Sequence, residues 1–268
     1  MNKLTKIGFI GAGNMGGAII GGMVKSKVFE ACDINVCDKL ISDEIVAMGI
    51  NQMGIKDTVE NSDYIVLAVK PGVLGDVLKE ITLAGGYSSK TYISIAAGYK
   101  IETMEKTLGK TKIIRVMPNI CLKVGEGMTV ICANDVCSQK ELDMAQNIFG
   151  SCGKTAVVKE SLIDACTAIN GSGPAYVFMF MESLSDAAVK HGIKRETAYL
   201  LAAQTVLGSA FLMLESGIHP GKLKDMVCSP GGTTIEAVSE LEDKGFRNAV
   251  ISAVDACVKK ADKMSKIK

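Results

Sequence analysis

The stretch that decides the fold is Ile7-Gly8-Phe9-Ile10-Gly11-Ala12-Gly13-Asn14-Met15-Gly16. Its apolar start predicts a short buried strand, and the G-x-G-x-x-G pattern leads into helix-forming residues 18–24. The first glycine permits a tight turn, the second lets the backbone approach a pyrophosphate, and the third allows close helix packing. The free N–H groups of the helix start then face the anion. A dinucleotide loop is therefore predicted, and the alternative is a glycine-rich turn without a ligand.

Around this loop, apolar runs of strand length alternate with amphipathic stretches up to about residue 160, a pattern typical of βαβ units around a parallel sheet. Continuously apolar runs such as residues 65–69 indicate strands buried on both faces. The predicted strands are residues 6–10, 34–38, a brief one near Ile55, 64–69, 92–95, 112–116, 127–131 and 155–158. The expected fold is α/β: a Rossmann-like dinucleotide-binding domain at residues 1–160, followed by an all-α dimerisation domain at residues 161–268.

The second half reads as helical because Ala, Leu, Met and Glu dominate it and β-branched clusters become rare. Residues 195–216 predict one helix of about 33 Å at 1.5 Å per residue. That helix is apolar nearly all round, so it must be buried on more than one side. The roughly 105 residues of the helical half form too thin a layer to enclose it. We therefore expect a homodimer through the helical domain.

Composition narrows the function classes further. The chain has 268 residues, with 30 basic and 29 acidic side chains, which leaves no electrostatic footprint for nucleic acid or an anionic membrane surface. Its nine cysteines include no C-x-x-C pair, and it has two histidines, so no metal site is expected. No secretory signal and no apolar stretch of membrane-spanning length are apparent, so a reducing cytoplasm is the expected location.

Two further segments should border a cofactor held by the glycine loop, because ligands bind at the carboxyl edge of open α/β sheets. They are Ala68-Val69-Lys70-Pro71, after the fourth strand, and Ser94-Ile95-Ala96-Ala97, after the fifth. After the second strand, Asp38 favours the ribose hydroxyls of NAD, whereas Lys39 can pair with the 2′-phosphate of NADP. The choice between the two cofactors stays open. Each of these charges can also be an ordinary surface charge.

Residues 229–234, Ser-Pro-Gly-Gly-Thr-Thr, predict a second site at a helix start. Ser229 is a candidate N-cap, and Pro230 then stands at the favoured first helical position. A glycine pair in a first helical turn is costly, so it suggests close approach of a ligand to the backbone. Free N–H groups with nearby hydroxyls suit a carboxylate. The alternative for residues 229–234 is an ordinary capped turn.

A separate segment, Gly171-Ser172-Gly173-Pro174, predicts a break or a kink in the helical region.

With these motifs in place, the chain resembles the pyrroline-5-carboxylate reductases over nearly its whole length. The resemblance is carried by residues 8–16, by Ala68-Val69-Lys70-Pro71, by Met117-Pro118-Asn119, by Gly125-Glu126-Gly127, by residues 171–176 and above all by residues 225–234. It implies reduction of 1-pyrroline-5-carboxylate to L-proline, the last step of proline biosynthesis, with NADP or NAD in reduced form as hydride donor. It also implies an interlocked dimer and, in some members, larger assemblies of dimers.

The resemblance also implies roles for individual residues. The substrate would be bound by Ser229, Gly231, Gly232, Thr233 and Asn119, with the Thr234 hydroxyl at the ring nitrogen as the catalytic group. The cofactor would contact Gly11, Gly13, Asn14, Met15, Gly16, Asp38, Lys39, Ala68, Val69, Lys70, Pro71, Ala96 and Ala97. The chain departs from the family pattern in three places: Ile120-Cys121-Leu122 replaces the usual Thr-Pro-Ala, Asn170 replaces a serine, and Ile55 replaces an asparagine.

Two other functions fit parts of the sequence. A β-hydroxyacid dehydrogenase shares the glycine-rich opening, but it needs a lysine one to two helical turns after a glycine-rich segment. The next lysine after Gly173 is Lys190, which is too far along the chain. A nicotinamide-sensing protein without turnover would not need the carboxylate site predicted at residues 229–234.

Overall fold

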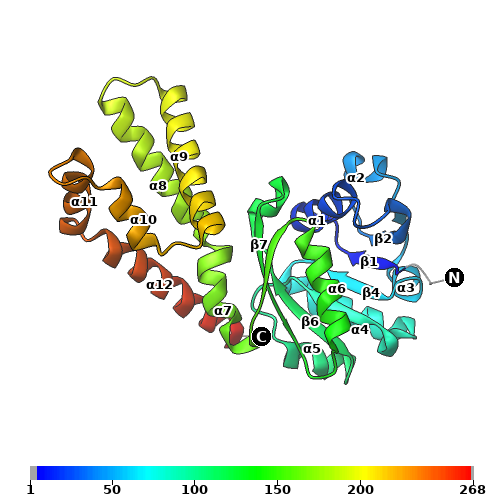
Figure 1. Cartoon of the computed structure of the whole chain (residues 1–268). Helices are drawn as coiled ribbons and strands as arrows, with labels where there is room; N and C mark the ends of the chain where they lie inside the picture. Colours follow the sequence, from blue (N-terminus) through cyan, green and yellow to red (C-terminus); the bar gives the residue numbers. More distant parts are fainter. Residues whose placement is uncertain (1–4, 267–268) are drawn as a thin grey trace. The chain divides into compact units, whose positions relative to one another are not determined.

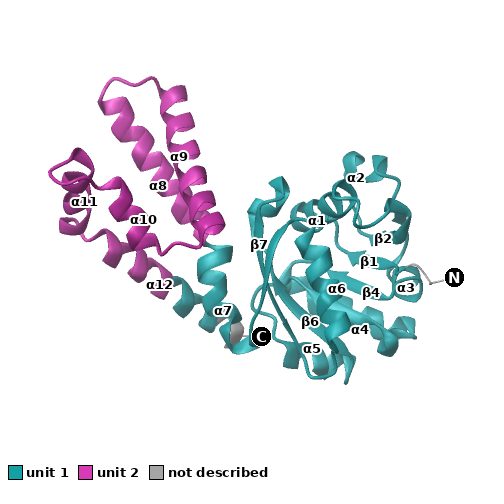
Figure 2. Cartoon of the chain, in the orientation of Figure 1, with its two compact units in different colours: residues 1–172, 257–268 teal, residues 173–256 magenta. Residues whose placement is uncertain are grey.

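The computed structural model describes residues 5–266, which form two compact units (Figures 1 and 2). The first unit holds residues 5–172 and 257–266, and the second holds residues 173–256. An α/β first unit followed by a helical second unit confirms the fold class expected from the sequence.

The first unit is built on one eight-stranded sheet with the strand order β3-β2-β1-β4-β5-β6-β7-β8. All neighbouring strands run parallel except β6 and β7, which pair antiparallel. The strands are β1 Ile7–Ile10, β2 Ile34–Cys37, β3 Asn51–Gln52, β4 Tyr64–Leu67, β5 Thr91–Ser94, β6 Lys112–Met117, β7 Gly127–Ala133 and β8 Gly153–Val157. The antiparallel pair arises because its connection, residues 118–126, is shorter than the dozen or so residues that a parallel crossover requires.

Helices cover both faces of this sheet, and each face has its own apolar core. One core joins the sheet to α1, α2 and α6, and the other joins it to α3, α4 and α5. Ile65, Val66 and Leu67 of β4 are fully buried, as expected for a strand covered on both faces. The helices of this unit are α1 Asn14–Lys25, α2 Asp43–Ala47, α3 Ile55–Glu60, α4 Pro71–Ala84, α5 Ile101–Leu108, α6 Gln139–Gly150 and α7 Ile163–Cys166.

The strand predicted near Ile55 is wrong, because Ile55 is the first residue of helix α3. The strand in this region, β3, is earlier and only two residues long. Gly54 precedes the helix in an extended conformation, and Thr58 and Val59 on the next turn are buried. Ile55 and Val59, one helical turn apart, therefore lie on one face of this helix, and two apolar residues in six are too few for periodicity to separate a helix from a strand.

Short helices of other types complete the first unit. They are η1 Ala31–Asp33, η2 Tyr87–Ser89, η3 Ile120–Val124, η4 Glu160–Leu162 and the π-helix η5 Thr167–Gly171. The π-helix ends just before α8 begins at Gly173, so the helical path changes type at the Gly-Ser-Gly-Pro segment. This change confirms the predicted break. Arg115 on β6, whose side chain is 1% exposed, anchors the approach to this segment through ion pairs with Glu160 and Asp164.

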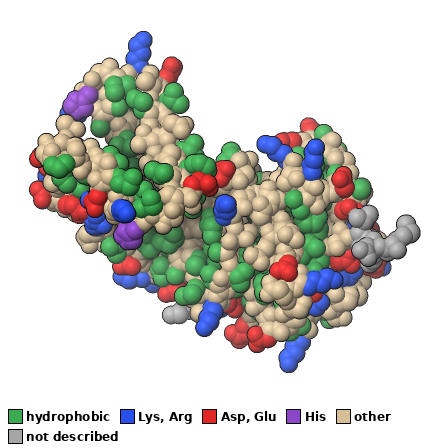
Figure 3. All heavy atoms as spheres, viewed as in Figure 1, with side chains coloured by type: hydrophobic (Ala, Val, Ile, Leu, Met, Phe, Trp, Pro, Cys, Tyr) green, Lys and Arg blue, Asp and Glu red, His purple; other side chains and the backbone are tan. Residues whose placement is uncertain are grey.

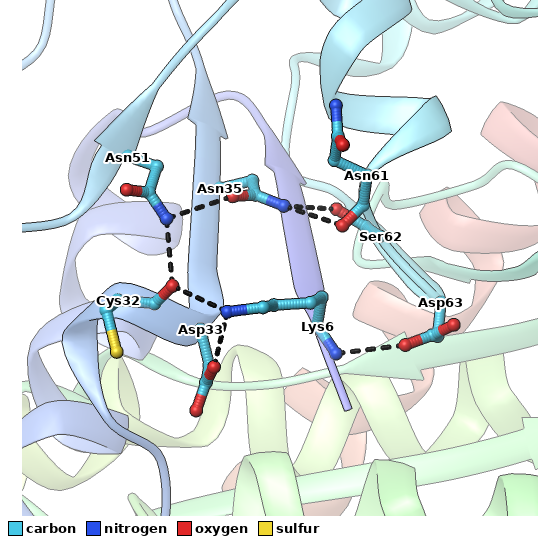
Figure 4. Close-up of polar contacts among 8 residues, drawn as sticks. All are labelled: Lys6, Cys32, Asp33, Asn35, Asn51, Asn61, Ser62 and Asp63. Atoms are coloured by element: carbon cyan, nitrogen blue, oxygen red, sulfur yellow. Dashed lines mark hydrogen bonds and ion pairs between the residues drawn. The ribbon is translucent and has the colours of Figure 1, made fainter. Parts of the chain in front are cut away.

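The amino ends of the strands are tied together by a polar network (Figure 4). The Lys6 ammonium group donates to the Asp33 carboxylate at 2.6 Å, just before β1 and β2 begin. Asn35 Nδ2 donates to Asn61 O at 3.0 Å and to Ser62 Oγ at 2.9 Å, while its Oδ1 accepts from Asn51 at 3.2 Å. The amino edge of the sheet is therefore held by paired polar groups and carries no part of the predicted site.

The second unit consists of α8 Gly173–Lys190, α9 Arg195–Ser216, α10 Pro220–Val227, α11 Thr233–Asp243 and most of α12 Phe246–Lys266. The helix predicted at residues 195–216 is confirmed as α9. Helices α8 and α9 pack against each other through the buried Ser185, whose hydroxyl donates to Ala198 O at 3.4 Å. Beside this contact, the Arg195 and Asp186 side chains form an ion pair at 2.6 Å.

The expectation that no stretch is long and apolar enough to span a membrane is wrong for α9. This helix has 22 residues, and its best 18-residue window has a mean hydropathy of 1.5 with only 11% of the window buried. Residues 197–214 contain no charged side chain, and Gly208 does not interrupt a helix that is apolar on both sides of it. Length and composition alone do not place a helix in a bilayer, since core helices of soluble proteins meet the same criteria.

Candidate functional site

The glycine loop has the geometry that a dinucleotide site requires. Gly11 follows β1 at φ 101°, and a Cβ there would lie 2.6 Å from the Ala68 carbonyl oxygen. A Cβ on Gly16 would collide with the Gly11 carbonyl group and lie 3.1 Å from Ala68 Cβ. Gly13 has open space where its Cβ would be. The first two constraints are internal packing, whereas the open backbone at Gly13 leaves room for a ligand.

Helix α1 begins at Asn14, directly after this loop, and Gly13 is its N-cap residue. No side chain caps the helix, so its first N–H groups remain available to an anion. Met15 is half-buried and Asn14 is exposed at this start. The loop therefore combines a close backbone approach with free donors, the two features that favour a pyrophosphate.

The carboxyl ends of β1, β4, β5 and β6 lie in consecutive order in the sheet, so the segments that follow them share one edge. After β4, Ala68 and Val69 lie against Gly11, Lys70 is the exposed N-cap residue of α4, and Pro71 starts that helix. Ala96 and Ala97 follow β5, and the buried Asn119 follows β6. The structure thus brings the predicted cofactor residues of these segments, and Asn119 from the predicted substrate set, to the edge that carries the glycine loop.

Asp38 reaches into the glycine loop from the end of β2. Its Oδ2 accepts the Ala12 N–H at 2.5 Å and its Oδ1 accepts the Leu40 N–H at 3.2 Å. Lys39 next to it is exposed. Burial raises the pKa of the preceding Cys37 thiol, and Glu80 and Asp38 raise it further, so this thiol stays neutral beside the loop. The Asp38 carboxylate is therefore held in place by two backbone N–H groups, whereas the exposed Lys39 ammonium group is not held in this way.

A cleft of about 1150 Å³ opens beside α1, between that helix, α2 and η3. It includes Ala12, Gly13 and Asn14 of the loop, together with Leu40, Ile41 and Ser42 from the segment after β2. The strand-end residues Ala68, Ala96 and Asn119 do not line it. Of the predicted cofactor segments, the cleft therefore borders the loop but not the ends of β4 and β5, and it extends to the region after β2, where the adenosine half of a dinucleotide would lie.

The segment predicted to bind a carboxylate is a turn followed by helix α11 in the second unit. Gly231 has φ 66°, a conformation that favours glycine, and the Gly232 N–H donates to Ser229 O at 3.0 Å. Thr233 and Thr234 occupy the first turn of α11, and Thr234 is half-buried. Glu236 also lies near this helix start, and it is exposed.

The N-cap predicted at Ser229, with Pro230 as first helical residue, is wrong. The helix begins at Thr233, and its N-cap is Gly232, which provides no side-chain cap. The two glycines therefore stand before the helix: Gly231 takes the left-handed turn, and a Cβ on Gly232 would collide with Ser229 Oγ. Both glycines lie outside the helix and the left-handed turn accounts for Gly231, so the argument from a costly glycine pair inside a helix does not hold. The uncapped N–H groups still suit a carboxylate.

Sequence reasoning missed three contributions in the first unit, at the glycine loop, at its cleft and at the end of β6. Ala12 provides the N–H group that holds Asp38, and Leu40 and Ser42 line the cleft. Asn170 is buried and bonds to the carbonyls of Met117 and Met128. A single asparagine between Ala168-Ile169 and Gly171, in an apolar stretch, was the available signal for a buried polar anchor.

Comparisons with known proteins show which family models and which proteins the chain resembles. A family model described as "Pyrroline-5-carboxylate reductase dimerisation" matches residues 160–264, and one described as "NADP oxidoreductase coenzyme F420-dependent" matches residues 6–98. The chain is 46% identical over 266 residues to the pyrroline-5-carboxylate reductase of Escherichia coli (strain K12), covering 97% of this chain and 98% of that protein.

Solved structures agree with this result. The pyrroline carboxylate reductase of Plasmodium falciparum with NADP bound aligns at a TM-score of 0.88 and 36% identity, covering 98% of each chain. A pyrroline-5-carboxylate reductase from Coxiella burnetii aligns at a TM-score of 0.92 and 34% identity, covering 98% of this chain and 99% of that one. These matches favour a reductase over a β-hydroxyacid dehydrogenase or a sensor without turnover. With this identity over nearly its whole length, the chain belongs to the pyrroline-5-carboxylate reductase family.

Proposed function

We propose that this protein reduces 1-pyrroline-5-carboxylate to L-proline with NADPH or NADH, the last step of proline biosynthesis. The observation that carries the proposal is the glycine loop between β1 and α1, with its open backbone at Gly13 and uncapped helix start, in a chain of this family. Family membership supports the substrate, and the loop supports the cofactor.

The residues of the loop fit a dinucleotide because Gly13 leaves space for it and the first N–H groups of α1 are free to bind its pyrophosphate. Asp38 would accept a ribose hydroxyl, and Ala68 to Pro71, Ala96 and Ala97 would border the nicotinamide half at the carboxyl edge. Reduced nicotinamide supplies a hydride to the carbon of the cyclic C=N bond. The remaining tasks of the protein are to place the substrate and to orient the ring nitrogen with its proton.

The proposed substrate groups are the first turn of α11 and the turn before it. The N–H groups of this helix start, with Ser229, Gly231, Gly232 and Thr233, would bind the carboxylate. Asn119 would contribute from the sheet edge. The Thr234 hydroxyl would orient the ring nitrogen, which bears the proton of the iminium before transfer and of the secondary amine after it. Correct placement of the two reactants can itself supply roughly 7 to 11 kcal/mol of barrier lowering.

The same proposal includes a homodimer that forms through the helical region. These dimers can assemble into larger oligomers, and the protein acts in the cytoplasm. The dimerisation model covers residues 160–264, which supports a functional division into residues 1–160 and 161–268. Exposed leucine and phenylalanine side chains on α9 support it as well, because a monomer rarely exposes so many large apolar groups on one helix.

The test is steady-state kinetics with 1-pyrroline-5-carboxylate and each reduced cofactor in turn. Cofactor oxidation should require the cyclic imine. Thr234→Ala should lower kcat by roughly 10²-fold, because losing the group that orients the ring nitrogen misplaces the reacting atoms. Ser239→Ala removes an exposed hydroxyl from the same helix and should leave kcat unchanged.

Two results would count against these assignments. A wild-type protein that binds the cofactor without oxidising it in the presence of the imine would refute the proposed activity. A Thr234→Ala variant with full kcat and unchanged KM for the imine would refute the role of Thr234 alone.

A further inference from the structure

Asn170 is a buried asparagine that joins the end of β6 to the start of β7. The residue is 8% exposed and lies in the π-helix η5, a helix type that occurs frequently at functional sites. Its Nδ2 group donates to Met117 O at 2.8 Å and to Met128 O at 3.1 Å. One amide group therefore holds backbone carbonyls on two antiparallel strands.

These bonds act on the segment that carries Asn119. Met117 is the last residue of β6, and Pro118 and Asn119 follow it directly. Asn119 Oδ1 accepts the Met128 N–H at 3.2 Å, so Met128 is held at its N–H by Asn119 and at its carbonyl by Asn170. The position of Asn119 at the carboxyl edge of the sheet is thus coupled to Asn170.

The orientation of the Asn170 amide follows from its contacts. Turning it over would place Oδ1 against two carbonyl oxygens, which have no proton to donate. In the orientation observed, Oδ1 is buried and has no hydrogen-bond donor. Asn35 at the opposite edge of the sheet differs, since both its amide nitrogen and its oxygen are bonded. A buried acceptor without a donor costs stability, so the Asn170 side chain is not optimised for stability alone.

We propose that Asn170 is a positioning residue for the nicotinamide end of the site. It clamps the Met117 and Met128 carbonyls and thereby sets the place of Pro118 and Asn119 beside Ala96 and Ala97. This inference rests on the proposed function, which puts the nicotinamide and the imine at that edge. Asn170 itself touches neither reactant.

The experiment compares Asn170→Ser with Asn35→Ser, a matched loss of a buried amide at the opposite edge of the sheet. Serine has one hydroxyl donor and can serve only one of the two carbonyls. We expect Asn170→Ser to weaken NADH or NADPH binding, followed by cofactor fluorescence, and to lower kcat, each roughly tenfold, because small displacements of reacting groups are costly. Asn35→Ser should lower the urea midpoint comparably while cofactor affinity and kcat stay within about twofold of wild type.

Asn170→Asp adds a pH profile that a purely structural role would not produce. An ionised aspartate has no donor for the two carbonyls, whereas a protonated one regains a donor. The kcat of this variant relative to wild type should therefore rise as the pH is lowered. If Asn170→Ser does not fold, Asn170→Thr replaces it, since threonine carries the same single donor with an added methyl group.

Loss of stability in Asn170→Ser with cofactor affinity and kcat as in wild type would overturn the proposal, as would a flat relative profile for Asn170→Asp. If the wild type binds the cofactor but reduces no cyclic imine, the proposed function fails while the effect of Asn170 on cofactor affinity is still measured. If the wild type binds neither cofactor, both fail.

Discussion

At the scale of single residues, the Asp38 carboxylate bears most directly on the choice of cofactor. One of its oxygens holds the Ala12 N–H in the glycine loop and the other holds the Leu40 N–H. A carboxylate has about four lone-pair sites, so one on each oxygen remains for the two hydroxyls of a ribose. A negative group fixed at that place repels a 2′-phosphate, and the exposed Lys39 has no comparable anchor.

We therefore expect the wild type to use NADH better than NADPH. Asp38→Asn should raise kcat/KM with NADPH on the order of tenfold and lower it with NADH, because the repulsion and the ribose acceptor are both weakened. The measurement is kcat/KM with each cofactor at saturating imine. Lys39→Gln is the matched control and should change neither value by more than about twofold. A wild type that prefers NADPH, with the preference lost in Lys39→Gln, would show that Lys39 dominates.

At the scale of elements, the start of helix α6 is joined to strand β6 by one buried carboxylate. Glu141 Oε1 accepts from the Lys112 ammonium group at 2.5 Å, and its Oε2 accepts the N–H and the hydroxyl of Ser138. Burial would raise the pKa of Glu141, but the bonds to Lys112 and Ser138 outweigh it and lower the pKa to about 2. The ionised form is thus the one that the fold stabilises.

Glu141→Gln should lower the free energy of unfolding at pH 7 by about 1 to 3 kcal/mol, the usual range for a buried group that loses its partners. Because the folded pKa is below the unfolded value of about 4.3, the contribution of Glu141 is present above that value and disappears as the pH falls toward 2. Urea unfolding at several pH values measures it.

Wild type and Glu141→Gln should therefore converge in stability between about pH 4.3 and pH 2. The control is Glu102→Gln, whose carboxylate forms an exposed pair with Lys106 and should cost less than about 0.5 kcal/mol. A gap between wild type and Glu141→Gln that stayed constant down to pH 2 would contradict the assigned role of the ionised carboxylate.

At the scale of the whole molecule, the helical unit buries few apolar side chains. Of the 22 residues of α9, only Ala198 and Ala202 are buried, whereas Leu200, Leu207 and Phe211 are 68%, 57% and 62% exposed. Figure 3 shows apolar side chains, in green, at the surface of the helical unit. Helix α9 is long and apolar enough for a membrane span, but a second copy of the chain packed on it would cover the same apolar side chains. The family model for dimerisation includes the whole of α9.

The protein should therefore sediment at no less than twice its chain mass of 28.3 kDa. Leu207→Glu should raise the dissociation constant of the dimer by at least about 10²-fold, since a buried charge without a partner costs several kcal/mol. Leu83→Glu is the matched control, because Leu83 is 87% exposed but lies on α4 in the first unit. Sedimentation of Leu207→Glu as a stable dimer would rule out this face of α9 as the interface.

The sequence by itself was sufficient for the parallel part of the sheet, the glycine loop, helix α9 and the division into an α/β and a helical half. Each of these rests on local information: continuous apolar strands, glycines at fixed spacing, and a long run of helix formers. Short segments were less certain. Six residues at Ile55 were too few to distinguish a helix face from a strand, and the preference of serine for cap positions placed the start of α11 too early, at Ser229.

Only the tertiary structure decided which groups meet across the chain. Asp38 lies 26 residues from Ala12, and Asn170 lies 53 residues from Met117, so no local pattern could reveal either bond. Both bonds depend on strand order and on how helices pack on the sheet, and those are set by burial over the whole unit. The sequence therefore determined which chemistry the chain carries, and the fold determined which side chains hold it in place.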